Sequence, residues 1–468
     1  MKSIKIKSED VVNSMRMDGG FHLSETTLIE RAIGKMGFKP LSFYADRIFT
    51  AGRKKRIYTT KNYGYPYLSN SDVITNNPFY NSKYNSKKYG YDSNAILNEG
   101  MIVTGRVGAI GQTAFITKYF ENKESMGSDN IIRIQTIDPN IRGFIYAYLT
   151  SKIGNTFLWK YATGGVQSYI NEDMVASIPI PNYNDLLKKE IHNLILECAT
   201  LRDNANEIMD AVDRKMHLEL KLEYLKPNEY NYFGPRSSQK TSHFSKNINE
   251  IDTTTINAFN YSFLIEQLID RVGQKNQTLP LSMVLDEKQI FSTGSFPRIE
   301  VKSNKGIMLI NQSDIFDTII KGKRISKRKV KTDNLAQYGE VMIAGVGTLG
   351  ENETFCRVIF ANEDIQGQLV SGEFIRMKTN SEVPSGYLYA WLNTDYGFRF
   401  IRSTQSGTKL CRPIPRLLLK LPVPILDKSI MLEIHNMVTK AHTLRYEANQ
   451  KELQAIQLVE NEIEQWQH

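Results

Sequence analysis

The sequence predicts an α/β (α+β) fold in which two similar mixed domains are separated by two long helices that form an antiparallel coiled coil. Three observations support this prediction. The chain contains an internal repeat, each copy carries a glycine-rich strand–turn–strand segment, and each copy ends in a long segment without proline or glycine. A chain of 468 residues is also too long for one ordinary hydrophobic core, because single cores stop growing at about 250–300 residues.

The repeat consists of several collinear matches. Ile191-His192-Asn193 recurs 243 residues later as Ile434-His435-Asn436, and the same offset relates residues 178–181 to residues 421–424. Upstream, residues 48–52 match residues 290–294 at an offset of 242, and Gly100 matches Gly339 at 239. The small drift in offset indicates short loop insertions. A repeat this long indicates duplication of a whole domain, since solenoid repeats span only about 20–50 residues.

Each copy shows the same order of elements. A glycine-rich strand–turn–strand is expected at residues 102–111 and 342–350. Apolar residues spaced three and four apart predict a short helix around residues 145–160 and 387–402. A glycine-containing loop, a Pro-x-Pro segment and a long helix follow in both copies.

The long helices carry a narrow apolar seam. Residues 186–226 contain no proline or glycine, and Pro227 ends the segment. A helix of that length extends about 60 Å at 1.5 Å per residue. Because one narrow stripe does not stabilise a lone helix, we expect the two helices to pair within the chain, and docking of a separate partner subunit is a compatible alternative. The seam residues proposed for these contacts are Ile191, Leu194, Leu201, Ile208, Ile434, Met437 and Leu444.

Composition favours a polyanionic partner. The formal net charge is +9, and lysine and arginine bind nucleic acid by neutralising phosphates and releasing counterions. A solvated basic surface is the alternative. Three widely spaced cysteines, no apolar leader at the N-terminus and no apolar run of about 18 residues predict a cytoplasmic protein with reduced thiols and no membrane contact.

No catalytic or metal-binding pattern stands out, so neither a catalytic nor a metal-ligating residue is predicted. The spacing Gly105-x-x-Gly108-x-x-Gly111 is not that of a dinucleotide- or phosphate-binding loop. Residues 76–80, Asn-Asn-Pro-Phe-Tyr, lack the second proline of an amino-methyltransferase motif and are interpreted as a turn. His192 and His435 flank the helical seams, where a structural or interface role is expected.

Clusters of basic residues are the positive evidence for a binding site. They lie upstream of the glycine-rich strands in both copies, and in copy one they alternate with tyrosines. Solvated loops would explain one such cluster, but its occurrence in both copies favours contact with DNA phosphates. The candidate residues are Arg53, Lys54, Lys55, Arg56, Lys83, Lys87 and Lys88 in copy one, and Lys323, Arg324, Lys327, Arg328 and Lys329 in copy two.

Two loops point to a family. Ala-Thr-Gly-Gly-Val-Gln-Ser-Tyr-Ile at residues 162–170, followed by Ile-Pro-Ile-Pro and a long helix, resembles the end of a target-recognition domain in type I restriction-modification specificity subunits. Ser-Gly-Thr-Lys at residues 406–409, followed by Leu-Pro-Val-Pro and a long helix, is similar. The family usually continues Pro-Pro-Leu-x-x-Gln before the helix, which this chain does not, and Lys409 stands where copy one has Gln167.

The resemblance implies a subunit without catalytic activity or a cofactor of its own. Each domain would recognise one half of a bipartite double-stranded DNA site, with Gln167, Ser168, Lys409 and Arg412 as candidate groove contacts. Two DNA adenine methyltransferase subunits carrying S-adenosylmethionine would dock on the helices. Two restriction/translocase subunits, which use ATP and Mg²⁺, would be optional additions.

The expected organisation is target-recognition domain 1 at residues 1–185, a central spacer helix at 186–226, a polar linker at 227–255, target-recognition domain 2 at 256–425 and a distal spacer helix at 426–468. Because the basic loops of the two copies differ, we expect the two half-sites to differ in sequence. The nearest alternative is a stand-alone sequence-specific DNA-binding protein with duplicated domains. A free-standing nuclease or methyltransferase and a structural or carbohydrate-binding protein are the others.

Overall fold

The computed structural model describes residues 5–466 except 7, 9–10, 13–16, 18, 23–25, 81, 109, 164–167, 227–228, 230–243, 303–305 and 352. The chain divides into two compact units. Unit 1 comprises Met1–Asp203 and Glu447–His468, and unit 2 comprises Asn204–Tyr446. The two long helices, α9 (Asp185–Glu219) and α15 (Lys428–Gln465), each contribute one part to unit 1 and the other part to unit 2.

Unit 1 is a mixed domain built on two four-stranded sheets, ordered β2-β9-β6-β7 and β3-β5-β4-β8, with a separate pair β1-β10. Before α9 its elements are α2 (Gly19–His22), α3 (Thr26–Met36), β1 (Phe38–Pro40), α4 (Leu41–Tyr44), β2 (Ala45–Thr50), β3 (Tyr58–Thr59), η1 (Lys61–Tyr63), β4 (Gly64–Leu68), β5 (Lys83–Ser86), η2 (Ser93–Ala95), β6 (Ile102–Gly105), β7 (Thr113–Phe115), α5 (Lys118–Asn122), β8 (Met126–Gly127), β9 (Ile131–Thr136), η3 (Pro139–Ile141), α6 (Arg142–Thr150), α7 (Lys152–Tyr161), α8 (Glu172–Ala176) and β10 (Pro179–Pro181).

Unit 2 repeats this architecture with three-stranded sheets, ordered β15-β14-β17 and β13-β12-β16, and with the pairs β11-β20 and β18-β19. Between the long helices its elements are η5 (Ile248–Glu250), η6 (Ala258–Tyr261), α10 (Phe263–Lys275), β11 (Thr278–Pro280), α11 (Leu281–Val284), η7 (Asp286–Lys288), β12 (Ile307–Ile310), β13 (Lys323–Ile325), η8 (Lys327–Lys329), η9 (Thr332–Asn334), β14 (Val341–Ala344), β15 (Val358–Phe360), β16 (Leu369–Val370), β17 (Phe374–Met377), α12 (Ser385–Leu392), α13 (Asp395–Ser403), β18 (Gln405–Ser406), β19 (Arg412–Pro413), α14 (Pro415–Leu418) and β20 (Pro422–Pro424).

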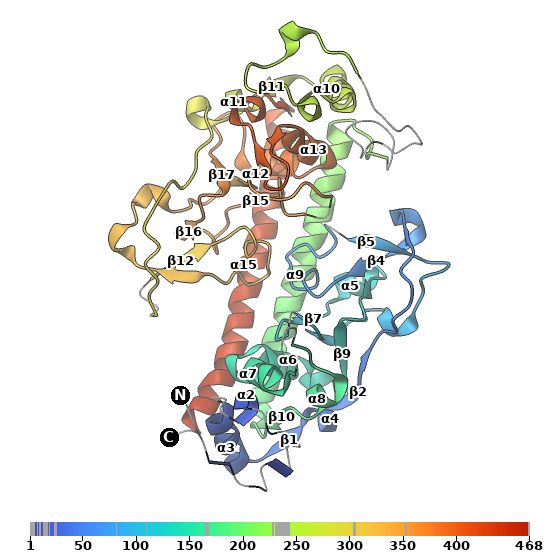
Figure 1. Ribbon diagram of the computed structural model, residues 1–468, viewed down its shortest axis with the longest axis vertical. Coiled ribbons are helices and arrows are strands. Elements are labelled where there is room, and N and C mark those ends of the chain that lie inside the picture. The colour runs from blue at the N-terminus through green and yellow to red at the C-terminus, as the bar shows by residue number, and fades with distance from the viewer. Residues whose placement is uncertain are drawn as a thin grey trace. The chain divides into compact units, whose positions relative to one another are not determined.

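The repeat seen in the sequence corresponds to a repeat in strand pairing. In both units a parallel pair lies beside an antiparallel one, β4 with β8 and β5 in unit 1, and β12 with β16 and β13 in unit 2. The Pro-x-Pro segments β10 and β20 pair with β1 and β11, the strands that follow α3 and α10. The two similar mixed domains that the sequence predicts are therefore confirmed (Figure 1).

Several side-chain contacts recur at the same offset of 243. The Gly143 and Gly386 amides donate to Nδ1 of His192 and His435, at 3.1 and 3.0 Å. Burial lowers the pKa of both imidazoles, which keeps Nδ1 available as an acceptor. The repeated histidines therefore attach the first turn of α6 and α12 to the long helices, which is the structural role that the sequence suggested.

The helix predicted around residues 145–160 is two helices, α6 and α7, and the one around 387–402 is likewise divided into α12 and α13. Ser151 interrupts the first with extended backbone, and its hydroxyl accepts from the Gly154 amide at 3.1 Å. Gly154 packs so closely that a Cβ there would lie 2.0 Å from the Tyr148 carbonyl oxygen. The repeated glycine therefore permits tight packing of consecutive helices, which apolar spacing alone does not reveal.

The central helix is shorter than predicted, since α9 ends at Glu219 and not at residue 226. Lys221 has a φ of 53°, and the Leu222 amide bonds to the His217 carbonyl at 3.0 Å, which closes the helix in a left-handed C-terminal turn. Leu222 and Leu225 then enter the core of unit 2. Most of the predicted linker lies outside the described residues.

The long helices pair antiparallel inside each unit, and two equivalent contacts mark the pairing. In unit 1, Arg202 of α9 donates to Asn449 of α15 at 3.0 Å. In unit 2, Arg445 of α15 donates to Asn206 of α9, also at 3.0 Å. Each residue is 243 positions from its counterpart. The same arginine–asparagine contact therefore occurs twice, with the roles of α9 and α15 reversed.

The neighbours of these pairs differ. In unit 1, Glu452 is buried and binds both Arg202 and the Tyr146 hydroxyl. In unit 2 the ring of His442 packs between Phe360 and Tyr389, with centroids 5.0 and 5.4 Å away. Burial, together with the charge of Arg445, holds the pKa of His442 well below its usual value.

Acid is therefore expected to destabilise unit 2. His442 is neutral when folded, and the unfolded chain takes up a proton below about pH 6.5, so stability holds above that pH and falls below it. The loss is at most about 1.4 kcal/mol per pH unit for one such group. The test is thermal denaturation between pH 5 and 8. The variant His442→Phe retains a ring and should show a shallower acid slope, while equal slopes would contradict the assignment.

Candidate nucleic-acid interface

The first basic cluster, residues 53–56, lies on the surface of unit 1 and is organised by acidic residues. Arg56 and Arg53 lie 2.7 and 3.9 Å from the Asp129 carboxylate. Lys54 lies 3.8 Å from Asp92, whose carboxylate also accepts from the Gly52 amide at 3.0 Å. Lys55 is exposed. The cluster is thus an exposed cationic segment fixed at two points, to Asp92 before η2 and to Asp129 between β8 and β9.

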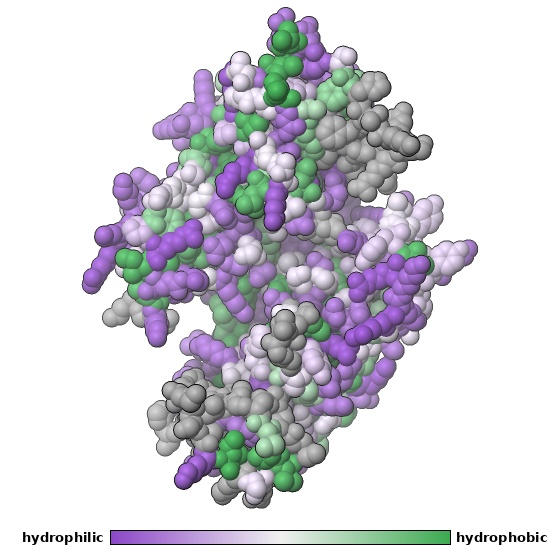
Figure 2. All heavy atoms as spheres, viewed as in Figure 1, coloured by the Kyte–Doolittle hydropathy of each residue, from purple (hydrophilic) through white to green (hydrophobic). Residues whose placement is uncertain are grey.

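The second cluster alternates lysine with tyrosine on the β3-β5-β4-β8 sheet. Lys83, Lys87 and Lys88 lie over the rings of Tyr58, Tyr65 and Tyr89, at 5.4, 4.8 and 5.1 Å from the ring centroids. Lys87 also pairs with Glu124 at 2.7 Å. The surface over β4 and β5 is mostly hydrophilic in Figure 2. The quadrupole of each ring attracts the lysine amine above it and so helps to hold these cations at the surface.

The loop that resembles a target-recognition domain lies beside the glycine-rich turn after β6. Tyr169 pairs with Val107 and with Thr163, and the Ile170 amide donates to the Arg106 carbonyl at 2.9 Å. Ser168 is half-buried, while Gln167 lies outside the described residues. The Arg106 amide in turn donates to Asn130 at 2.8 Å, next to Asp129. The first basic cluster, Arg106 and this loop therefore form one continuous region of unit 1.

In unit 2 the equivalent loop is the β18–β19 hairpin. Residues 406–410 are exposed at its tip, and they include Lys409, while Arg412 lies exposed in β19. Cys411 and Gly347 form an isolated pair of backbone hydrogen bonds of 2.8 and 3.2 Å. The glycine-rich turn after β14 is thus joined to the hairpin, as the turn after β6 is joined to Tyr169.

The predicted basic residues of unit 2 occupy β13 and η8. Lys323 pairs with Glu300 at 2.5 Å, and Arg324 lies 3.5 Å from the Gly306 carbonyl. Lys327, Arg328 and Lys329 are exposed in η8. The contacts of this segment run to β12 and to the small apolar cluster around Ile325, so it forms a region separate from the hairpin.

Arg106 and Tyr169 are not among the contacts predicted from the sequence. Both lie next to the family-like loop in unit 1, and Tyr169 is 42% exposed. Their adjacency depends on a bridge between segments that are about sixty residues apart in the chain. A local pattern cannot show such a contact, although the matching glycines of the two turns indicated that this region is shared by both copies.

The predicted seam residues are buried or half-buried, and they serve two kinds of contact. Ile191 and Leu194 lie in the core of unit 1 with Ala455, Val459 and Ile463 of α15. Ile434, Met437 and Ile208 lie in or against the core of unit 2. Leu201 lines an open hollow of 620 Å³ on the unit 1 part of the helix pair, and Leu444 is half-buried in α15.

Within the part of the chain that the structure describes, no three histidine, cysteine, aspartate or glutamate side chains form a group able to hold a metal ion. Among the same residues no helix is both long and apolar enough to cross a bilayer. Cys198, Cys356 and Cys411 are buried and unbridged, as the sequence suggested.

Both units have the same arrangement. In each one the glycine-rich turn is joined to a second loop, and basic residues lie exposed on the surface. The family model "Type I restriction modification DNA specificity domain" matches residues 46–183. Residues 46–183, which lie in unit 1, are thereby similar to the specificity domain of type I restriction-modification systems. The family resemblance seen in the sequence is confirmed.

Solved structures to which the chain is similar include the type I restriction-modification S subunit from M. genitalium, at 14% identity and a TM-score of 0.33, covering 92% of this chain and 94% of that one. The HsdS subunit from Thermoanaerobacter tengcongensis is 12% identical with a TM-score of 0.26, over 92% of this chain and 96% of that one. A structure described as showing complex assembly and conformational transition of the type I R-M system is 13% identical with a TM-score of 0.28. No curated protein matches the sequence significantly.

Proposed function

We propose that this chain is the non-catalytic DNA-recognition subunit of a type I restriction-modification complex, and that its two units recognise the two halves of an asymmetric bipartite site. The observation that carries the proposal is the same loop pair in both units, Val107 with Tyr169 and Gly347 with Cys411, within a chain whose first unit matches the specificity-domain family. DNA sequence is recognised by a few side chains on base edges, while backbone contacts set position.

The two loop pairs carry different side chains, which supports different half-sites. Unit 1 presents Ser168 and Tyr169, and its basic surface is rich in tyrosine. Unit 2 presents Lys409 and Arg412 on a hairpin. Arginine and lysine favour guanine edges in the major groove, whereas serine is permissive. We assign Gln167, Ser168, Lys409 and Arg412 to groove contacts, and the lysines and arginines of residues 53–56, 83–88 and 323–329 to phosphates.

The partners follow from the same proposal. Two DNA adenine methyltransferase subunits would bind the helix pairs, and the hollow on unit 1 lined by Leu196, Leu201 and Glu197 offers an apolar floor beside charged residues for one of them. S-adenosylmethionine would be carried by those subunits, and ATP and Mg²⁺ by restriction/translocase subunits where these join. The complex would act in the cytoplasm.

A stand-alone DNA-binding protein with duplicated domains is the second candidate, favoured by the basic surfaces of both units. The two candidate functions differ in whether the protein needs a methyltransferase subunit to act at its site. A stand-alone protein would bind its specific site tightly without a methyltransferase subunit, whereas the site of a specificity subunit is methylated only by the assembled complex.

The decisive experiment is methylation mapping of host DNA by single-molecule sequencing, with the gene present and with it deleted. We expect one split, asymmetric motif to lose adenine methylation in the deletion strain and to regain it on complementation. A palindromic motif would contradict the proposal of two different half-sites. No change in any motif would favour the stand-alone protein.

A further inference from the structure

Three arginine side chains in unit 2 gather around one aromatic ring. Arg357, Arg399 and Arg402 are all buried, and their guanidinium carbons lie 3.9, 5.7 and 4.8 Å from the centroid of the Phe398 ring in α13. Three like charges are costly to bury unless each is compensated. We call this group the arginine cluster.

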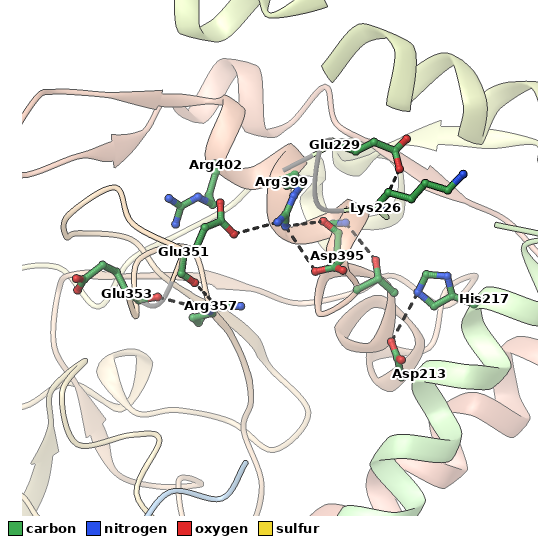
Figure 3. Close-up of polar contacts among 12 residues, drawn as sticks. Asp213, His217, Lys226, Glu229, Glu351, Glu353, Arg357, Asp395, Arg399 and Arg402 are labelled. Atoms are coloured by element: carbon green, nitrogen blue, oxygen red, sulfur yellow. Dashed lines mark hydrogen bonds and ion pairs between the residues drawn. The ribbon is translucent and has the colours of Figure 1, made fainter. Parts of the chain in front are cut away.

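The arginine cluster binds the turn that begins at Gly350 and Glu351, after the glycine-rich segment that follows β14. Arg402 donates to the Gly350 carbonyl at 3.0 Å, and Arg399 pairs with the Glu351 carboxylate at 2.9 Å. Arg357 donates to the Glu351 carbonyl at 2.7 Å. Figure 3 shows Arg399 between Glu351 and Asp395, the latter 3.5 Å away. The turn is thereby fixed against α13.

The other end of this segment holds the hairpin. Gly347 is paired with Cys411, and the Gln312 amide group bonds both backbone groups of Val346, at 2.7 and 3.1 Å. A Cβ on Gly347 would lie 3.0 Å from the Phe355 side chain, so the backbone approaches closely here. The position of the hairpin tip therefore depends on the same segment that the arginine cluster fixes.

Unit 1 has an equivalent tie made by one neutral side chain. Asn155 of α7 donates to the Gly111 carbonyl at 2.6 Å. Gly111 is the counterpart of Gly350, and Asn155 stands at the position of Phe398. Both units therefore attach the glycine-rich segment to the helix behind it, but unit 2 does so with charged groups.

We propose that Arg357, Arg399 and Arg402 are positioning residues for base recognition by unit 2, although they touch no base themselves. They hold the recognition edge, which we define as residues 346–350 and 405–413. This inference rests on the proposed function. Its physical basis is that hydrogen bonds to base edges require donor–acceptor distances of about 2.7–3.2 Å, so a displacement of about 1 Å at the hairpin tip removes them.

The test uses the complex with its methyltransferase subunits and short DNA duplexes mismatched in one half-site at a time. For Arg402→Met we expect discrimination against mismatches in the half-site of unit 2 to fall about tenfold, a loss comparable to one base contact. Discrimination at the other half-site and affinity for unrelated DNA should not change. Arg402→Lys can still donate to Gly350 and should recover part of the loss.

The matched control is Asn155→Ala, which should reduce discrimination only at the half-site of unit 1. Glu351 is partly exposed, so Glu351→Gln offers a milder change if Arg402→Met fails to fold, with a smaller loss at the same half-site. Folded variants with unchanged discrimination, or with equal loss at both half-sites, would overturn the inference. If the wild-type complex prefers no bipartite site, the proposed function itself fails.

Discussion

Replacing Glu340 with alanine is expected to destabilise unit 2 by about 3–5 kcal/mol, the usual cost of leaving a buried charge without its partner. Glu340 and Arg376 are each 1% exposed, and they form a two-point pair with distances of 2.8 and 2.9 Å. Arg376 also donates to the Leu335 carbonyl at 2.7 Å. That hydrogen bond remains in the variant, but a carbonyl carries no full negative charge and cannot replace the carboxylate of Glu340.

The measurement is chemical denaturation followed by the tryptophan fluorescence of Trp391, which lies in the core of unit 2. Glu300→Ala is the control, because it removes an exposed carboxylate paired with Lys323 in the same unit. Exposed pairs contribute at most about 1 kcal/mol. Similar losses in the two variants would show that the Glu340–Arg376 pair has no special role.

Changing Lys83, Lys87 and Lys88 together to glutamine is expected to weaken DNA binding by the complex for all sequences alike. Each phosphate contact contributes about 0.9 to the slope of log affinity against log salt concentration. Loss of three contacts should therefore make that slope less steep by about 2.7. Fluorescence anisotropy between 50 and 200 mM salt measures the slope directly.

The matched control changes Lys35, Lys39 and Lys152 to glutamine. These lysines are also exposed in unit 1 and carry the same total charge, but they lie in α3, β1 and α7. Their loss should leave the slope almost unchanged. An equal change in both variants would indicate that net charge, and not the lysine–tyrosine surface, determines binding.

The general plan of the fold could be predicted because it depends on features that recur along the chain. Glycines at matching positions mark shared turns, and Gly100 and Gly339 both have a positive φ, at 82° and 80°. Seam spacing located the paired helices, and a Pro-x-Pro segment marked the start of each one. Duplication supplied a second observation of each pattern, which a single domain would not offer.

Other features depend on contacts between distant residues and could not be predicted. Arg133 and Arg376 are counterparts in β9 and β17, yet only Arg376 has a buried carboxylate partner, because Met101 stands where unit 2 has Glu340. Arg133 instead donates to carbonyls of residues 95, 127, 128 and 131, and burial lowers its pKa to about 10. Arginines at equivalent sequence positions therefore have different electrostatic environments.

The candidate site was predictable in outline only. Lysine and arginine runs predicted basic surfaces, and the family-like loops predicted Gln167, Ser168, Lys409 and Arg412 as groove contacts, which stay predictions. The pairing of Gly347 with Cys411, and the arginines behind it, depend on strand topology that no local pattern encodes. The helix end at Glu219 was missed because a lysine, and not a glycine, occupies the left-handed position at residue 221.

The division of each long helix between two units affects the order in which the protein can be made. Ala455, Val459 and Ile463, close to the end of the chain, are part of the hydrophobic core that also contains Ile33 and Phe144. During synthesis the first unit is translated first, yet its core lacks these side chains until residues 455–463 have left the ribosome. Unit 1 is thus the first to be translated and the last to have a complete hydrophobic core.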